Sequence, residues 1–114
     1  MKKTGNVLGL AAALLFSLGL AASAHAKSHA WTGWISDSAC GAKGANAGAK
    51  DCTMKCVKQH GAKYVFVNES NKKVYAIANQ KAVSESDLGH EVVLHGSLTK
   101  KGSIVASSIT AKGM

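Results

Sequence analysis

The second half of the chain contains four short segments in which apolar residues tend to occupy every other position. These segments are 64–68, 73–80, 91–98 and 103–111. Alternation with a period of two is typical of strands that have one buried face, and polar turn residues separate the segments. The last two segments flank T-K-K-G and are predicted to form a hairpin. The polar connection before them has room for one helical turn at 84–88.

The first half adds a strand and a helix to this pattern. Segment 31–38 is rich in aromatic and β-branched residues and is predicted to be the first strand. Gly33 inside it indicates a bulge or a close approach of another backbone. The small, polar residues 41–50 indicate a surface loop. Asp51 is then placed to N-cap a helix over 52–60 that turns its Cys, Val and Met side chains inward.

Five antiparallel strands in so short a chain leave two sheet edges to protect. Closing the sheet into a small barrel removes both edges. The hairpin sequence E-V-V-L-H-G-S-L-T-K-K-G-S-I-V-A-S-S-I also resembles the final pair of strands in an OB barrel. We therefore expect a mainly β fold, a small five-stranded OB-like barrel with one short helix between strands 1 and 2.

Residues 1–26 have the pattern of a secretory signal peptide. Lys2 and Lys3 precede an apolar run over 7–22, and Ala24-His25-Ala26 follows as a small-residue cleavage site. The run is short and interrupted for a membrane span, so no transmembrane anchor is expected after cleavage. We expect a single domain over 27–114, exported to the periplasm or the extracellular space, where conditions are oxidising.

The charge of the chain limits the choice of partner. All 14 basic residues are Lys, and the formal net charge is +8, of which the leader supplies two charges. Lys without Arg gives a diffuse positive surface and not the bidentate clamps that bind phosphate. Export also separates the protein from nucleic acid, which is not expected as a partner. The Lys excess favours solubility and a loose attraction to anionic envelope polymers.

The three cysteines, Cys40, Cys52 and Cys56, allow at most one disulfide within the chain. Cys52 and Cys56 lie one helical turn apart, which is a poor disulfide geometry. We predict a Cys40–Cys56 disulfide because Cys56 points further into the apolar face of the helix. Closing this loop would contribute about 3 kcal/mol. Cys52 is then the candidate free thiol, either a reactive thiolate at the helix N-terminus or a spare buried cysteine.

A metal site is the alternative use of the same cysteines. Cys40, Cys52 and Cys56 could share one Cu(I) or Zn²⁺ ion, with a water or another His completing the coordination. His60 cannot join Cys52 on one ion, because eight helical residues separate them by about 12 Å. An oxidising compartment works against free thiols. With the disulfide formed, no cofactor is expected.

No catalytic residues are predicted. The motifs C-x-x-C, H-E-x-x-H and G-x-S-x-G are absent from the sequence, and the six acidic residues include no candidate catalytic pair. We therefore expect a protein that is not an enzyme.

Aromatic residues offer a candidate ligand face. OB barrels bind oligosaccharides and oligonucleotides on the face of their second and third strands. Here that face could present four side chains to an unknown envelope or extracellular ligand: Trp34, Tyr64, Phe66 and Tyr75. The alternative is that these side chains fill the core, because the predicted domain has few other large apolar residues. The sequence carries no signal of oligomeric state.

Four motifs bear on family membership. They are W-T-G-W-I-S-D-S-A-C-G-A-K, C-T-M-K-C, G-A-K-Y-V-F-V and K-V-Y-A-I-A-N-Q. In these the chain resembles a family of short exported bacterial proteins that is classed as a domain of unknown function. The resemblance covers most of 31–111 and implies a fold and a compartment but no activity. That family often has His after C-G-x-K, where this chain has Gly44, which weakens any metal site that needs that His.

Together these features predict an exported, non-enzymatic OB-like module that binds a ligand or serves the cell envelope. The alternative is a thiol-dependent metal-binding (Cu/Zn) or redox protein centred on Cys52.

Overall fold

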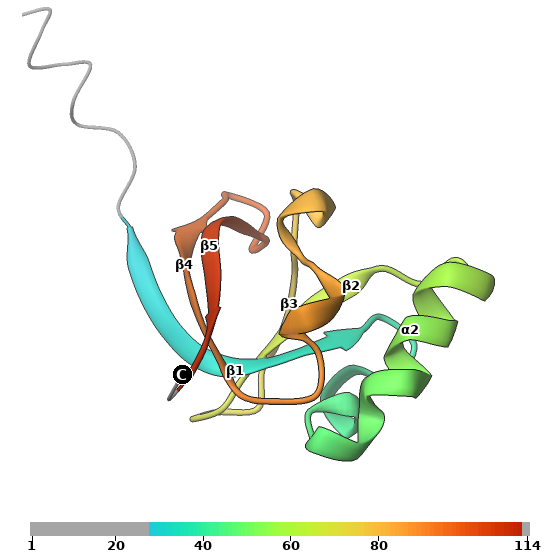
Figure 1. The fold of residues 1–114 in the computed structure, drawn as a ribbon. Coiled ribbons are helices and arrows are strands. Elements are labelled where there is room, and N and C mark those ends of the chain that lie inside the picture. The colour runs from blue at the N-terminus through green and yellow to red at the C-terminus, as the bar shows by residue number, and fades with distance from the viewer. Residues whose placement is uncertain (1–27, 113–114) are drawn as a thin grey trace, which may run out of the picture.

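The computed structural model describes residues 28–112, and the predicted signal peptide lies outside the described residues. Figure 1 shows the arrangement of the chain. The elements, with η for a 3-10 helix, are β1 (His29–Asp37), η1 (Gly41–Gly44), η2 (Ala47–Ala49), α2 (Lys50–Gln59), β2 (Tyr64–Asn68), β3 (Val74–Ala76), η3 (Gln80–Ala82), η4 (Glu85–Asp87), β4 (Val92–Leu98) and β5 (Ile104–Ala111). Within 28–112, no helix has the length and apolar character needed to cross a membrane.

The strands form one antiparallel sheet in the order β3-β2-β1-β4-β5, which confirms a mainly β fold with one short helix between the first two strands. The central strand, β1, pairs with β4 through its first half and with β2 through its second half. Gly33 belongs to both halves, opposite Val92 on one side and Asn68 on the other. A Cβ there would lie 2.1 Å from the Val67 carbonyl oxygen, which confirms the predicted close backbone approach.

The predicted closure into a barrel is incomplete in the structure. β3 ends at Ala76, earlier than the predicted 73–80 strand, and the next residues turn toward β5. A single bridge joins Ile77 to Ile104, and the Asn79 side chain bonds both the backbone carbonyl and the backbone amide of Ala106, at 2.7 and 2.9 Å. These contacts bring the two edges together but do not make a continuous ladder. The sheet of the described residues is therefore open.

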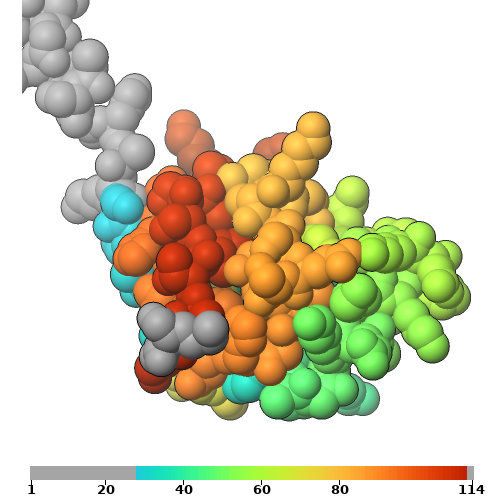
Figure 2. Space-filling model, viewed as in Figure 1, coloured from blue at the N-terminus to red at the C-terminus, as the bar shows by residue number. Residues whose placement is uncertain are grey.

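The main core lies on one face of the sheet. Its buried members are Ile35, Phe66, Ile77, Leu88, Val92, Leu94, Ile104 and Ala106. Figure 2 shows the connection between β3 and β4 filling the surface between β5 and α2. The predicted helical turn in this connection is η4, where Ser84 and Asp87 form a capping box. An ion pair between Lys58 of α2 and Glu85 of η4 ties the helix to this connection.

The cysteine-bearing segment differs in detail from its prediction. The helix α2 begins at Lys50, and the residue before it, Ala49, makes no side-chain cap. Asp51 therefore lies in the first turn, and the prediction that it N-caps the helix is wrong. The residues predicted as a loop form η1 and η2, and η1 packs against β1 and β2. Thr53 is the buried residue of the helix, and Met54 packs against the main core.

Candidate metal centre

The end of β1 approaches α2 (Figure 1), and the three cysteines come together in this part of the fold. The Sγ atoms of Cys40, Cys52 and Cys56 all lie within 4.8 Å of one another. Cys52 is exposed, and the other two are half-buried. Residues 40 and 52 are separated by two short 3-10 helices, so this cluster depends on how that segment folds back onto the sheet. We call these three side chains the cysteine triad.

Hydrogen bonds at the end of β1 fix the backbone of Cys40. The Asp37 Oδ1 atom accepts hydrogen bonds from the backbone amides of Ala39 and Cys40, both at 2.9 Å. The Ser36 hydroxyl donates to the Gly41 carbonyl oxygen at 2.7 Å. Gly41 has φ +56°, a conformation that glycine adopts without steric cost. The turn therefore holds Cys40 in place from both sides.

The two helical cysteines are positioned by helix geometry alone. Cys52 and Cys56 are four residues apart on α2, so their side chains lie one above the other on the same face. His60, at the C-cap of the helix, is exposed and is not part of the group of ligand atoms around the triad. This agrees with the helical spacing, which separates it from Cys52.

Position 44 borders the triad but has no room for a side chain. A Cβ on Gly44 would lie 2.2 Å from the Ser36 Oγ atom and 3.6 Å from the Cys40 Cβ atom. Gly44 is buried, and its backbone rests directly on Ser36. A histidine at this position would have to displace Ser36. Among the described residues, the triad therefore offers three sulfur ligands and no histidine.

Electrostatics keep two of the thiols protonated near neutral pH. Burial raises the pKa of the Cys56 thiol to about 11, and the Asp37 carboxylate adds to the shift. The same carboxylate is the main reason that the pKa of Cys40 is raised above its usual value. Thiolates are the reactive form of cysteine, and a raised pKa disfavours them. Neither of these two cysteines has the lowered pKa that marks a redox-active thiol.

The predicted Cys40–Cys56 disulfide is not present in the structure. All three cysteines are free thiols, and no pair within 28–112 lies at disulfide distance. Cys40 faces both helical cysteines together, because Cys52 and Cys56 share one face of α2. The structure thus brings together the set named in the metal alternative, and the disulfide stays a prediction about the oxidised protein.

The predicted aromatic ligand face does not form. Phe66 is fully buried in the main core, and Tyr64 and Tyr75 pack against that core. Trp34 lies opposite Val67 in the sheet, so it is on the other face from Phe66. Tyr64, Phe66 and Tyr75 do share one face, but it is the core face, as the alternative had it. Only Trp34 lies on the other face, so the four side chains do not form one ligand face.

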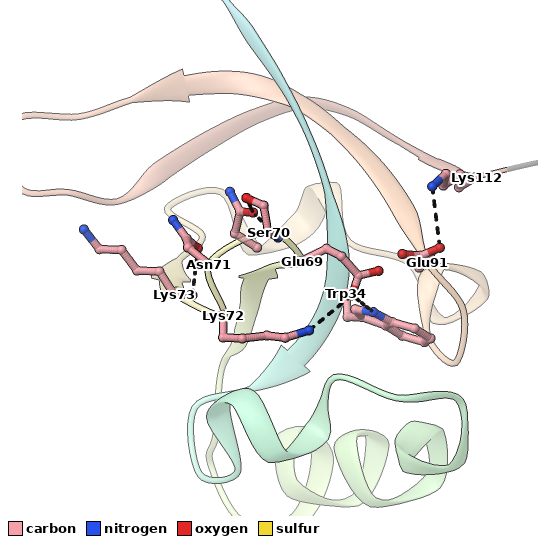
Figure 3. Close-up of polar contacts among 9 residues, drawn as sticks. Trp34, Glu69, Ser70, Asn71, Lys72, Lys73, Glu91 and Lys112 are labelled. Carbon is pink, nitrogen blue, oxygen red and sulfur yellow. Dashed lines mark hydrogen bonds and ion pairs between the residues drawn. The ribbon is translucent and has the colours of Figure 1, made fainter.

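Trp34 has a polar partner on its own face of the sheet. Its Nε1 atom donates a hydrogen bond to the Glu69 Oε1 atom at 3.4 Å, and the Lys72 Nζ atom lies 3.4 Å from the same oxygen. Figure 3 shows this network beside β1, with the Lys112–Glu91 ion pair further along the sheet. The indole is thus anchored within the domain at its polar end.

Comparison with known proteins adds no assignment: no family model matches the chain, and neither a curated protein nor a solved structure is significantly similar to it. The resemblance to short exported proteins stays a prediction, as do export and the lack of enzymatic activity. The geometry of the triad is therefore the best indication of function.

Proposed function

We propose that this protein binds one soft or borderline metal ion, Cu(I) or Zn²⁺, through the cysteine triad. The observation that carries the proposal is the mutual approach of three Sγ atoms to within 4.8 Å. Thiolates are preferred ligands of both ions. This adopts the metal-binding alternative of the sequence analysis in place of the expected envelope-ligand module.

The triad needs little adjustment to hold an ion. A tetrahedral ion with metal–sulfur bonds of about 2.3 Å keeps its sulfurs about 3.8 Å apart. The present separations exceed this by at most about 1 Å, a change that side-chain rotation at Cβ can supply. The backbones need not move, which matters because Cys40 is held by Asp37 and the other two by α2.

The raised pKa values of Cys40 and Cys56 argue against thiol redox chemistry at these two residues. A redox-active cysteine needs a stabilised thiolate, whereas Cys40 and Cys56 have raised pKa values. A metal ion supplies the missing positive charge and displaces the thiol protons. In an oxidising compartment the bound ion would also compete with disulfide formation for the same sulfurs.

We also propose that the sheet belongs to an OB-like barrel and that the domain acts after export. The Ile77–Ile104 bridge supports the first point, because it brings the free edges of β3 and β5 together. The signal-peptide pattern of residues 1–26 supports the second. Neither point is needed for the metal proposal.

Metal titration of the reduced protein tests the proposed function. The full chain, prepared anaerobically with reductant, should bind one equivalent of Zn²⁺ or Cu(I) and lose its reactivity toward a thiol reagent. Cys52→Ser should weaken binding at least about hundredfold, because one of the three ligands is lost. His60→Ala is the matched control on the same helix and should leave the stoichiometry and affinity unchanged.

Protein isolated from its native compartment provides the second arm of the test. Thiol counting, metal analysis and peptide mapping would distinguish a metal site from the predicted disulfide. One free thiol, a Cys40–Cys56 bond and no metal after isolation, together with no binding by the reduced chain, would overturn the proposal.

A further inference from the structure

Asp37 is the buried carboxylate next to the triad. It is the last residue of β1, its exposed fraction is 0%, and its Oδ1 atom holds the turn that carries Cys40. The Oδ1 atom therefore has a structural role in this turn. The Oδ2 atom makes none of these hydrogen bonds and is available to the site.

The second oxygen of Asp37 has no partner. Its Oδ2 atom is buried and makes no hydrogen bond to any residue of the described chain. Buried polar atoms are nearly always hydrogen-bonded, and an orphan carboxylate oxygen is more costly than a neutral one. An unpaired carboxylate oxygen close to a set of ligand atoms indicates that an ion, or a water molecule bound to an ion, completes its hydrogen bonding.

The Asp37 carboxylate is also tied directly to the triad by geometry. Its Oδ1 atom accepts a hydrogen bond from the backbone amide of Cys40 at 2.9 Å. Its oxygens are nevertheless outside the group of mutually close ligand atoms, which contains the three sulfurs alone. Asp37 is therefore not a member of the ligand set, and its unpaired oxygen is available to bond a ligand of the metal in place of the metal itself.

Resting on the proposed function, we infer that Asp37 accepts a hydrogen bond from a water molecule in the fourth coordination position of a bound Zn²⁺ ion, and that it selects Zn²⁺ over Cu(I). Zn²⁺ prefers four ligands, and open zinc sites complete their coordination with water. Outer carboxylates that bond a ligand of the metal increase affinity and fix its orientation.

Charge balance favours the same ion. Three thiolates and the Asp37 carboxylate carry four negative charges in a half-buried site. Zn²⁺ offsets two of them and Cu(I) offsets one, so the repulsion left over is smaller with zinc. Without the carboxylate this preference for the divalent ion is reduced, and the soft thiolates favour Cu(I) more strongly.

The test compares two metals and two variants of the reduced full chain. Asp37→Asn keeps the Oδ1 atom that holds Cys40 but removes the charge and the second carboxylate oxygen. We expect it to weaken Zn²⁺ binding about 10–100-fold, the range for loss of an outer partner, and to change Cu(I) affinity by less than about threefold. Asp51→Asn is the matched control, because Asp51 is an exposed carboxylate in the first turn of α2. It should change neither affinity.

X-ray absorption at the zinc edge of the wild-type protein keeps the inference testable if Asp37→Asn does not fold. The expected zinc shell has three sulfurs and one oxygen. A shell with four sulfurs, or with no oxygen, would overturn the role of Asp37.

The two proposals fail in different ways. If the wild-type chain binds neither metal, the proposed function fails and the inference fails with it. If the wild-type chain binds zinc but folded Asp37→Asn weakens both metals equally, or neither, the triad remains a metal site and Asp37 has no selective role.

Discussion

The hairpin of β4 and β5 buries Val92, Leu94 and Ile104 completely, whereas the buried residues between 38 and 60 are Gly44 and Thr53. The hairpin is held by a backbone ladder along both strands and by apolar packing. The cysteine segment, residues 38–60, is held by hydrogen bonds at the end of β1 and by the contacts of α2 and η1. Its ligand atoms stay accessible as a result.

This difference teaches how a small domain can separate stability from function. Apolar burial supplies most of the folding free energy, and it is concentrated in the sheet. A cysteine ligand must instead lose its proton to bind a metal, and burial among apolar side chains makes that loss more costly. The following predictions test this division, from the largest expected effect to the smallest.

Gly33→Ala should be the most damaging single substitution considered. The added Cβ would lie 2.1 Å from the Val67 carbonyl oxygen and 2.7 Å from the Phe66 ring, so β1 and β2 must separate. We expect a loss of more than about 4 kcal/mol of unfolding free energy, measured by urea denaturation. Gly48→Ala in the cysteine segment is the control and should stay within about 0.5 kcal/mol, since its nearest neighbour is 3.5 Å away.

Phe66→Ala should cost about 3–5 kcal/mol, because it empties the centre of the main core. The half-buried Val57 of α2 is the comparison, and Val57→Ala should cost less than about 1.5 kcal/mol. Equal losses in the two variants would show that the helix packs as tightly as the sheet. If Phe66→Ala leaves the unfolding free energy unchanged, Phe66 is not a core residue, and the predicted ligand face would apply to it again.

Metal affinity should rise steeply with pH. The pKa of Cys56 is about 11 and that of Cys40 is raised, so both thiols are protonated near neutral pH and must release their protons to bind an ion. These two protons alone strengthen apparent affinity by at least about hundredfold per pH unit between pH 6 and 8, and acid reverses the gain. Competition titrations at several pH values measure this slope. A slope below tenfold per unit would mean that the thiols are already ionised.

Glu85→Gln should have the smallest effect. The Lys58–Glu85 pair lowers the pKa of Glu85 but is about half exposed, so we expect the Tm to fall by less than about 4 °C at pH 7. Because the pKa of Glu85 is lowered on folding, the ion pair stabilises the fold fully at pH values above the unfolded pKa of about 4.3. This stabilisation is lost as the pH falls through the folded pKa. The difference in Tm should therefore shrink as the pH falls below about 4.3. A difference that persists there would point to packing and not to charge.

Local patterns predicted the elements of the sheet well. Alternating residues located β2 at Tyr64–Asn68 without error, and the T-K-K-G turn located the last hairpin. The prediction of where the helix begins was less accurate. Asp51 has the chemistry of an N-cap but lies within the helix, because η2 runs directly into α2 and moves the start to Lys50.

The candidate site was predictable only in part. The spacing of Cys52 and Cys56 placed them on one helical face, and Cys40 was a candidate third ligand from the count of cysteines alone. Asp37 was missed as a member of the site. Its one available signal was its position three residues before Cys40, where a carboxylate can bond the backbone amides that follow it.

By itself, the sequence determined the strands, the helix and the special backbone role of Gly33. These features follow from periodicity, turn chemistry and sterics, which act over a few neighbouring residues. Only the tertiary structure decided that Cys40 meets both helical cysteines, that Phe66 belongs to the core, and that Asp37 lies buried with one oxygen unpaired. The cysteine cluster depends on how α2 and η1 pack against β1, and the burial of Phe66 depends on how the strands and the β3–β4 connection enclose the core. Packing between segments distant in the chain has no local pattern from which it can be predicted.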